Sequence, residues 1–453
     1  MDSEVRELIF TPLLDGSLRQ IIADFTINLP DGPVTSPALV SFGGDKFQFT
    51  MHFVGEDPPP CLILPGKTTF TQDDTFAIHG QIASKIAFEC RDVFPPCGTS
   101  THSRGTSTLV LESSKMHLVP EGTDQMQSAE LRALLGKTPK SEGAEETDFR
   151  SHSIFHGPKL RLRNAETNTV RTNDFLGEAS KSSMDTHVFS GNGYEGALIQ
   201  KDKELHLHLR AKEISSKDDG LDWDSLVRRV EKAVAFTHGF QPWPVYREIR
   251  KNHRVTERWI ACHIDLGQTS LSPISETLWA NVHGNSSDPL HQIIPTIADG
   301  LGSLPKPIQK GLHNLLWQFR AAELSDLPGT TKLLMICAIL DGIMKLLSGK
   351  TDPSKKAPTD KTWIAGCAAA GLSWDKWGSD LFELFGKHRQ HLAHGWLWLP
   401  TNDDPSVYFS DYPKLCGGLN TLVAAACGYE GLVLTDAFRS RALLIKSVKG
   451  AKL

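Results

Sequence analysis

The chain has 453 residues, of which 40% are hydrophobic and 22% are charged, and its formal net charge is −5 at pH 7. This length predicts two to four domains of ordinary globular composition, and the negative charge argues against a protein that coats nucleic acid non-specifically. The eight cysteines are scattered without a close Cys-x-x-Cys pair, so we expect reduced, half-buried thiols rather than a disulfide framework.

The beginning of the chain carries charged residues at once and lacks the apolar core of a signal peptide. No apolar run approaches the ~18 residues that are needed to span a membrane. We therefore expect a cytoplasmic protein without membrane contact.

Residues 1–215 are predicted to form a β-rich N-terminal domain. Apolar residues alternate at 21–27 and 47–53, further strands are expected at 82–90, 159–163 and 205–210, and glycine and proline clusters separate the runs. Up to about residue 120 the chain is expected to consist of strands. The polar stretch at 120–152 is predicted to be an exposed loop.

Residues 216–289 are predicted to be a mixed connecting segment. Leu226, Val230 and Val234 recur at helical spacing, and this helix should end near Gly239. The pattern at 247–262 is mixed, and the pattern at 271–285 is irregular.

From residue 290 to 453 the chain is predicted to be helical, with helices at 308–323, 331–347, 373–394 and 413–427. The expected fold class is therefore α+β, a β-rich N-terminal domain followed by an all-α helical bundle.

The third of these helices ends in Arg389-x4-His394-Gly395. An arginine stays charged and offers a planar fork of donors to a phosphate, and a histidine with a pKa near 6.5 can move a proton at neutral pH. RNA supplies its own nucleophile, the 2′-hydroxyl. These two side chains therefore suffice for a cleavage that leaves a 2′,3′-cyclic phosphate and a 5′-hydroxyl, without a metal or another cofactor.

The spacing of the pair adds a geometric constraint. Five residues turn an α-helix by about 500°, so Arg389 and His394 point roughly 140° apart. Either the arginine wraps back, or the last turn unwinds before Gly395, or a second chain completes the site. We favour the second chain, because two copies supply one histidine for each proton transfer.

The Arg389-x4-His394-Gly395 element resembles the signature of HEPN domains. Two further segments, 333–341 and 422–431, make the helical third similar to the HEPN half of ApeA-like antiphage proteins. The segments 76–80 and 86–90 resemble, more loosely, the β-rich front domain of that family. In one departure, Gln390 follows the arginine where active members often carry asparagine or another short polar residue.

This resemblance implies an endoribonuclease of phage defence that acts as a homodimer through its HEPN domain and cleaves RNA, with tRNA as a target. It implies Arg389 and His394 as catalytic residues, and Asp341 as the inward acidic residue of a neighbouring helix. It also implies that the N-terminal domain senses a phage-derived trigger and restrains the nuclease.

RNA contacts are predicted beside the arginine and in the basic tail of the chain. The candidate residues are Gln390, His391, Arg439, Arg441 and Lys446. For the tail, a solvated helix end is the alternative. His388, His391 and His394 are not expected to bind a metal, because successive three-residue steps drift about 60° around a helix.

Two other functions fit the sequence. One is a non-catalytic HEPN protein that binds a nucleotide or a regulatory partner. The other is a carbohydrate- or peptide-binding β domain with a helical dimerisation tail.

Overall fold

The computed structural model describes the chain in segments. The described segments are 1, 3–29, 32–42, 46–54, 75–83, 85–93, 106–119, 149–156, 185–201, 203–212, 222–240, 243–251, 254–262, 290–324, 327, 329–349, 360–393, 405–434 and 442–445. The chain forms two compact units. Unit 1 comprises residues 1–155, 213–216 and 244–265, and unit 2 comprises 156–212, 217–243 and 266–453.

Unit 1 is built on an antiparallel sheet with the strand order β9-β13-β14-β8-β6-β5-β1-β3-β4-β7, and β2 pairs with β1 at the side of this path. The strands are β1 (Arg19–Leu29), β2 (Gly32–Thr35), β3 (Ala38–Phe42), β4 (Phe47–Val54), β5 (Phe76–Ile82), β6 (Ile86–Val93), β7 (Thr106–Ser113), β8 (Lys115–Leu118), β9 (Phe149–His156), β13 (Tyr246–Lys251) and β14 (Arg254–Ala261).

Alternation explains why β4 forms and which face it buries. Phe47, Phe49 and Met51 are fully buried, and the polar residues between them point to the other face. Phe49 stacks between two further core rings, Phe25 on β1 and Phe88 on β6, at centroid distances of 5.6 and 5.7 Å. The strands expected at 21–27 and 47–53 are thus confirmed.

The first residues of the chain are helical, so the expectation of strands throughout 1–120 is wrong there. This segment consists of α1 (Ser3–Val5), the π-helical η1 (Arg6–Phe10) and α2 (Thr11–Leu14). Val5, Ile9 and Leu13 follow one another at intervals of four residues and join the core of the sheet. This spacing places them on one face of the helical segment.

Unit 2 begins with an antiparallel three-stranded meander of β10 (Asp185–Ser190), β11 (Tyr194–Lys201) and β12 (Glu204–Ala211). Helix α5 (Trp223–His238) follows, and the Asp222 carboxylate caps its N-terminus by accepting from the Ser225 N–H at 3.2 Å. Gly239 ends α5 with a φ of 76°, a left-handed conformation that glycine adopts without strain. The predicted end of this helix is confirmed.

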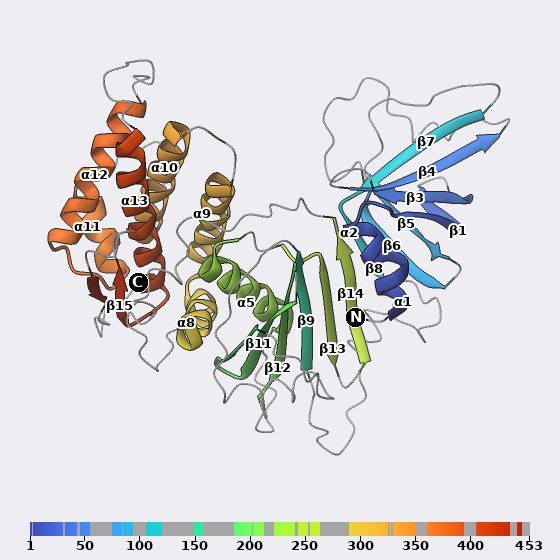
Figure 1. Ribbon diagram of the computed structural model, residues 1–453, viewed down its shortest axis with the longest axis horizontal. Coiled ribbons are helices and arrows are strands. Elements are labelled where there is room, and N and C mark those ends of the chain that lie inside the picture. Colours follow the sequence, from blue (N-terminus) through green and yellow to red (C-terminus); the bar gives the residue numbers. More distant parts are fainter. Residues whose placement is uncertain are drawn as a thin grey trace. The chain divides into compact units, whose positions relative to one another are not determined.

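The remaining helices of unit 2 are α8 (Leu290–Ser303), α9 (Lys306–Leu324), α10 (Gly329–Leu347), α11 (Asp360–Ala369), α12 (Lys376–Ala393) and α13 (Pro405–Ala426). Figure 1 shows α10, α11, α12 and α13 gathered together. Helices α9, α10 and α12 match their predicted ranges to within one turn, whereas α13 ends as predicted but begins eight residues earlier. Helix α11 was not predicted, and Gly366 lets it approach α10: a Cβ there would lie 2.7 Å from the sulfur of Met344.

The segment 247–262, for which the sequence showed only a mixed pattern, is a hairpin of β13 and β14. The prediction that the chain is all-α to its end is wrong, because β15 (Gly431–Leu434) pairs with β16 (Ala442–Ile445). A short apolar run of four residues does not distinguish a strand from a buried helix by its periodicity. The fold is therefore mixed α and β, with a large antiparallel sheet and a set of helices.

Several predictions lie outside the described residues or at their edge. The strand at 159–163, the irregular segment at 271–285 and most of the polar stretch at 120–152 are not described, and β9 begins at residue 149. None of the described helices combines the length and apolar character of a membrane-spanning segment. The six cysteines that the structure describes carry free thiols and are buried rather than half-buried.

Candidate active site

Helix α12 carries the arginine of the predicted site and contacts α10, α11 and α13. An aromatic cluster fixes it: the ring of Trp363 on α11 lies 5.2 Å from that of Phe382 and 4.7 Å from that of Phe385. Trp363 is fully buried. This packing holds the last two turns of α12 in place, and these turns bear His388 and Arg389.

Two consecutive residues of α12 contact carboxylates on different helices. Successive residues of an α-helix point about 100° apart. His388 therefore faces Asp411 on α13, and Arg389 faces Asp341 on α10. The same end of α12 thus makes two separate charged contacts.

The Asp341 contact is open and incompletely paired. Oδ2 of Asp341 lies 3.9 Å from Nη2 of Arg389 and accepts a hydrogen bond from Nζ of Lys345 at 3.2 Å. Oδ1 of Asp341 is buried without a hydrogen-bond partner among the described residues. The Arg389 side chain is 36% exposed, so its guanidinium can still reach a ligand. Two cations around one carboxylate leave a net positive charge of about one.

Arg389 also has two apolar neighbours. Its guanidinium carbon lies 5.8 Å from the centroid of the Phe385 ring, within the range of a cation–π contact. Cys337 lies one turn before Asp341 on α10. Burial raises the pKa of the Cys337 thiol to about 12, against the opposing effect of the Arg389 charge, so this thiol is protonated at neutral pH and is no nucleophile.

The Asp411 contact differs in being fully paired and in including a buried histidine, although its two lysines are more exposed than Arg389 and Lys345. Oδ2 of Asp411 lies 2.9 Å from Nε2 of His388 and accepts from Nζ of Lys387 at 3.2 Å, and Oδ1 accepts from Nζ of Lys414 at 3.4 Å. Asp411 and His388 are both buried. Each oxygen of Asp411 is therefore paired, and the cluster joins α12 to α13.

The structure brings together two of the predicted site residues, Arg389 and Asp341. Gln390 and His391 belong to α12, but their side chains lie outside the described part, as do His394, Arg439, Arg441 and Lys446 in full.

Sequence reasoning missed Lys345 and the Asp411 cluster. Lys345 carried a usable signal, since it follows Asp341 by four residues and the two side chains are neighbours on a helix. Asp411 carried none, because its pairing with His388 depends on how α12 and α13 pack.

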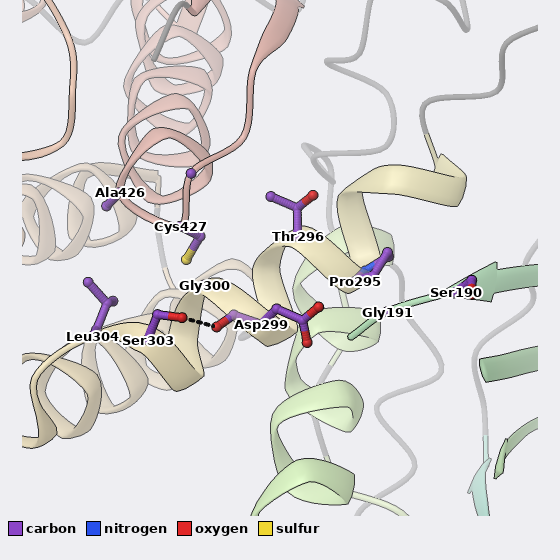
Figure 2. A pocket seen from close by; sticks show the side chains of 11 residues that line it. Ser190, Gly191, Pro295, Thr296, Asp299, Gly300, Ser303, Leu304, Ala426 and Cys427 are labelled. Atoms are coloured by element: carbon purple, nitrogen blue, oxygen red, sulfur yellow. Dashed lines mark hydrogen bonds between the residues drawn. The ribbon is translucent and has the colours of Figure 1, made fainter. Parts of the chain in front are cut away.

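Unit 2 contains a cleft of about 720 Å³ between α8, the start of the 191–193 turn and the end of α13, away from the contacts of Arg389. Figure 2 shows Asp299, Thr296 and Ser303 on α8 together with Cys427 at the end of α13. The Asp299 carboxylate accepts from the Asn192 N–H at 3.0 Å.

Burial raises the pKa of Asp299, and it raises the pKa of the Cys427 thiol to about 12. The residues that line the cleft all belong to the described part and include no lysine or arginine. Two cations, Arg229 and Lys212, lie close enough to the cleft to oppose the effect of burial on the pKa of Asp299.

Comparison of the chain with protein-family models, with curated proteins and with solved structures found no match.

Proposed function

We propose that the protein is a metal-independent endoribonuclease of the HEPN type, and that unit 2 carries its active site. One observation carries the proposal. Arg389 of the Arg-x4-His element lies against Asp341 on a neighbouring helix. Its side chain is half-exposed, and a second cation, Lys345, contacts the same carboxylate. An open site with a net positive charge is suited to the phosphate of an RNA backbone.

In the proposed reaction, the RNA 2′-hydroxyl attacks the adjacent phosphorus while one histidine removes the hydroxyl proton. The bond from phosphorus to the 5′-oxygen breaks, and a second histidine returns a proton to that oxygen. Arg389 and Lys345 stabilise the negative charge that grows on the phosphate oxygens. Asp341 orients both cations. His394 is the proton-transfer residue in this scheme, and a homodimer provides two copies of it.

The biological setting follows from the resemblance to ApeA-like antiphage proteins. In that setting, the finer architecture is a β-rich N-terminal sensor followed by a HEPN bundle, cleavage of RNA such as tRNA aborts infection, and a phage product relieves a restraint imposed by the N-terminal region. Within unit 2, β10 packs on α8. A fragment that tests the restraint should therefore keep residues 185–212 with the helices.

The function is tested by incubating the purified full chain with total RNA in the presence of EDTA. We expect fragmentation by the wild type, and none by Arg389→Ala or His394→Ala. Lys361→Ala is the matched control, because Lys361 is an exposed cation on α11 that takes no part in the contacts of Arg389, Asp341 and Lys345. Fragmentation that disappears with EDTA but persists in both active-site variants would refute the proposal.

A further inference from the structure

Helix α9 carries an aromatic and basic stripe on its solvent side. Lys306, Lys310, His313 and Trp317 fall within about 60° of one another around the helix axis, and we call these four residues the α9 stripe. The opposite side of α9 is occupied: Gly311 packs against Leu346 of α10, and Leu315 packs against Gly342. The α9 stripe is therefore not needed to hold α9 on α10.

Two tryptophans are exposed together at this stripe. Trp317 is 40% exposed and Trp243 is 42% exposed, although both are large apolar side chains. Their ring centroids lie 6.0 Å apart, and the rings are tilted by 45°. Exposed apolar surface that is gathered rather than scattered marks an interaction site.

The charge of the surroundings restricts what this site can bind. Lys306 and Lys310 are exposed, and no described carboxylate forms an ion pair with either. The one acidic residue of α9, Glu323, is buried and paired with Arg320. Lys232 of α5 reaches the crevice beside His313 and Trp317. The exposed side of α9 is thus positively charged.

His313 adds a third aromatic ring. Burial, and then the positive charge of Lys232, lowers the pKa of His313 to about 4. Its ring is therefore neutral at pH 7, beside the exposed face of Trp317. Uncharged aromatic rings among exposed lysines are the combination that binds unpaired bases and the phosphates between them.

We propose that the α9 stripe and Trp243 form a docking surface for single-stranded RNA, separate from the Arg389–Asp341 site. Bases stack on Trp317 and Trp243, and the backbone phosphates contact Lys306 and Lys310. The choice of RNA as partner rests on the proposed ribonuclease function. Paired RNA does not offer the base faces that this surface requires, so the surface selects single-stranded or looped segments.

The experiment measures the affinity of the full chain for a fluorescent 2′-O-methyl RNA of about 12 nucleotides, a length within the usual range for single-strand binding sites. This probe lacks a free 2′-hydroxyl, so it cannot be cleaved by the proposed reaction. The variants are Trp317→Leu, which keeps apolar bulk but loses the aromatic face, and the double variant Lys306→Glu with Lys310→Glu. Lys361→Glu is the matched charge control, and the thermal midpoint of each variant verifies folding.

We expect Trp317→Leu to weaken binding by about tenfold, the effect of losing one stacked base. The double lysine variant should weaken binding further and reduce the dependence of affinity on salt. Lys361→Glu should bind within about twofold of the wild type, because one distant charge is screened.

The outcomes separate the two proposals. If the α9 variants bind like Lys361→Glu while the wild type cleaves RNA, the docking surface is wrong and the function stands. If the wild type binds through the α9 stripe but never cleaves a natural RNA, the docking surface stands and the ribonuclease function falls. Binding of a poly-glutamate peptide that matches RNA binding would assign the surface to acidic proteins and overturn the proposal.

Discussion

Helix α12 contacts two carboxylates with consecutive residues, and the two contacts differ in how completely they are paired. Asp411 is buried and forms ion-pair contacts with His388, Lys387 and Lys414. Asp341 contacts Lys345 and, at a longer distance, the half-exposed Arg389. One of its oxygens has no hydrogen-bond partner among the described residues. Asp411 holds a buried histidine and pairs both of its oxygens, as a packing contact requires, whereas Arg389 is held to Asp341 only by a 3.9 Å contact and can turn towards a ligand. We therefore assign a structural role to the Asp411 side of α12 and a functional role to the Asp341 side.

The largest effect is expected on the functional side. Arg389→Ala should lower the rate of RNA cleavage by at least about 100-fold, the cost of losing a charge that stabilises the transition state. Its thermal midpoint should stay close to that of the wild type, because the guanidinium is half-exposed and 3.9 Å from its partner.

Lys387→Ala is the matched control, since it removes a cation two residues earlier on the same helix. It should cleave RNA at nearly the wild-type rate. Equal losses of activity in the two variants would mean that the two sides of α12 do not differ in role.

On the structural side, Asp411→Asn should destabilise the protein by about 3 kcal/mol, because it removes the charge that pairs a buried histidine and two lysines. The free energy of unfolding, measured with urea at pH 7.5, provides the test. A change below about 1 kcal/mol would show that the cluster around Asp411 does not hold α12 on α13.

The pH range for these measurements is limited by His238 of α5. Burial, and then the charge of His187, lowers the pKa of His238 to about 3. The unfolded chain takes up a proton at this residue near pH 6.5, but the folded chain does not. The contribution of His238 to the free energy of unfolding is therefore complete above pH 6.5. As the pH falls this free energy decreases, by about 2 kcal/mol at pH 5.

This pH dependence is checked by measuring unfolding at pH 7.5 and pH 5 for the wild type and for His238→Phe, which cannot titrate. The variant should lose less stability on acidification. An identical loss in both proteins would assign the acid sensitivity to other groups.

The smallest effect is expected for Asp341→Asn, which makes the same atomic change as Asp411→Asn at the other carboxylate. Its free energy of unfolding should change by less than about 1 kcal/mol, because Asp341 has no buried charged partner of the kind that His388 is to Asp411, and Arg389 lies 3.9 Å away. Cleavage should fall less than in Arg389→Ala, since the arginine remains but is less well oriented. Destabilisation as large as that of Asp411→Asn would remove the contrast between the two carboxylates.

The parts of the fold that were predicted are those where the apolar pattern repeats clearly. Helices α9, α10 and α12 have one apolar side, and β4 alternates. The β13–β14 hairpin was missed because Arg247 and Glu248 are buried in it, so the alternation of apolar and polar residues fails. Glu248 is stabilised there by Arg258, its direct cross-strand neighbour in the hairpin, whose Nε donates at 2.9 Å.

The sequence predicts individual residues of the site from their chemistry and spacing, but not the contacts that they make with other helices. Arg389 stood out through its spacing to His394, and Asp341 through the resemblance. Because they are consecutive residues of an α-helix, His388 and Arg389 must point in different directions. Which helices they contact depends on tertiary packing. Asp411 therefore became visible only in the structure.

The most direct test of the central claim is the chemistry of the product ends. The full chain, in EDTA, is incubated with an end-labelled RNA and with the same RNA carrying one 2′-deoxy nucleotide at the cleaved position. We predict 2′,3′-cyclic phosphate and 5′-hydroxyl ends from the first RNA, no cleavage at the substituted position of the second, and no products with Arg389→Ala. Cleavage at the 2′-deoxy position, or products with 3′-hydroxyl ends, would contradict the account.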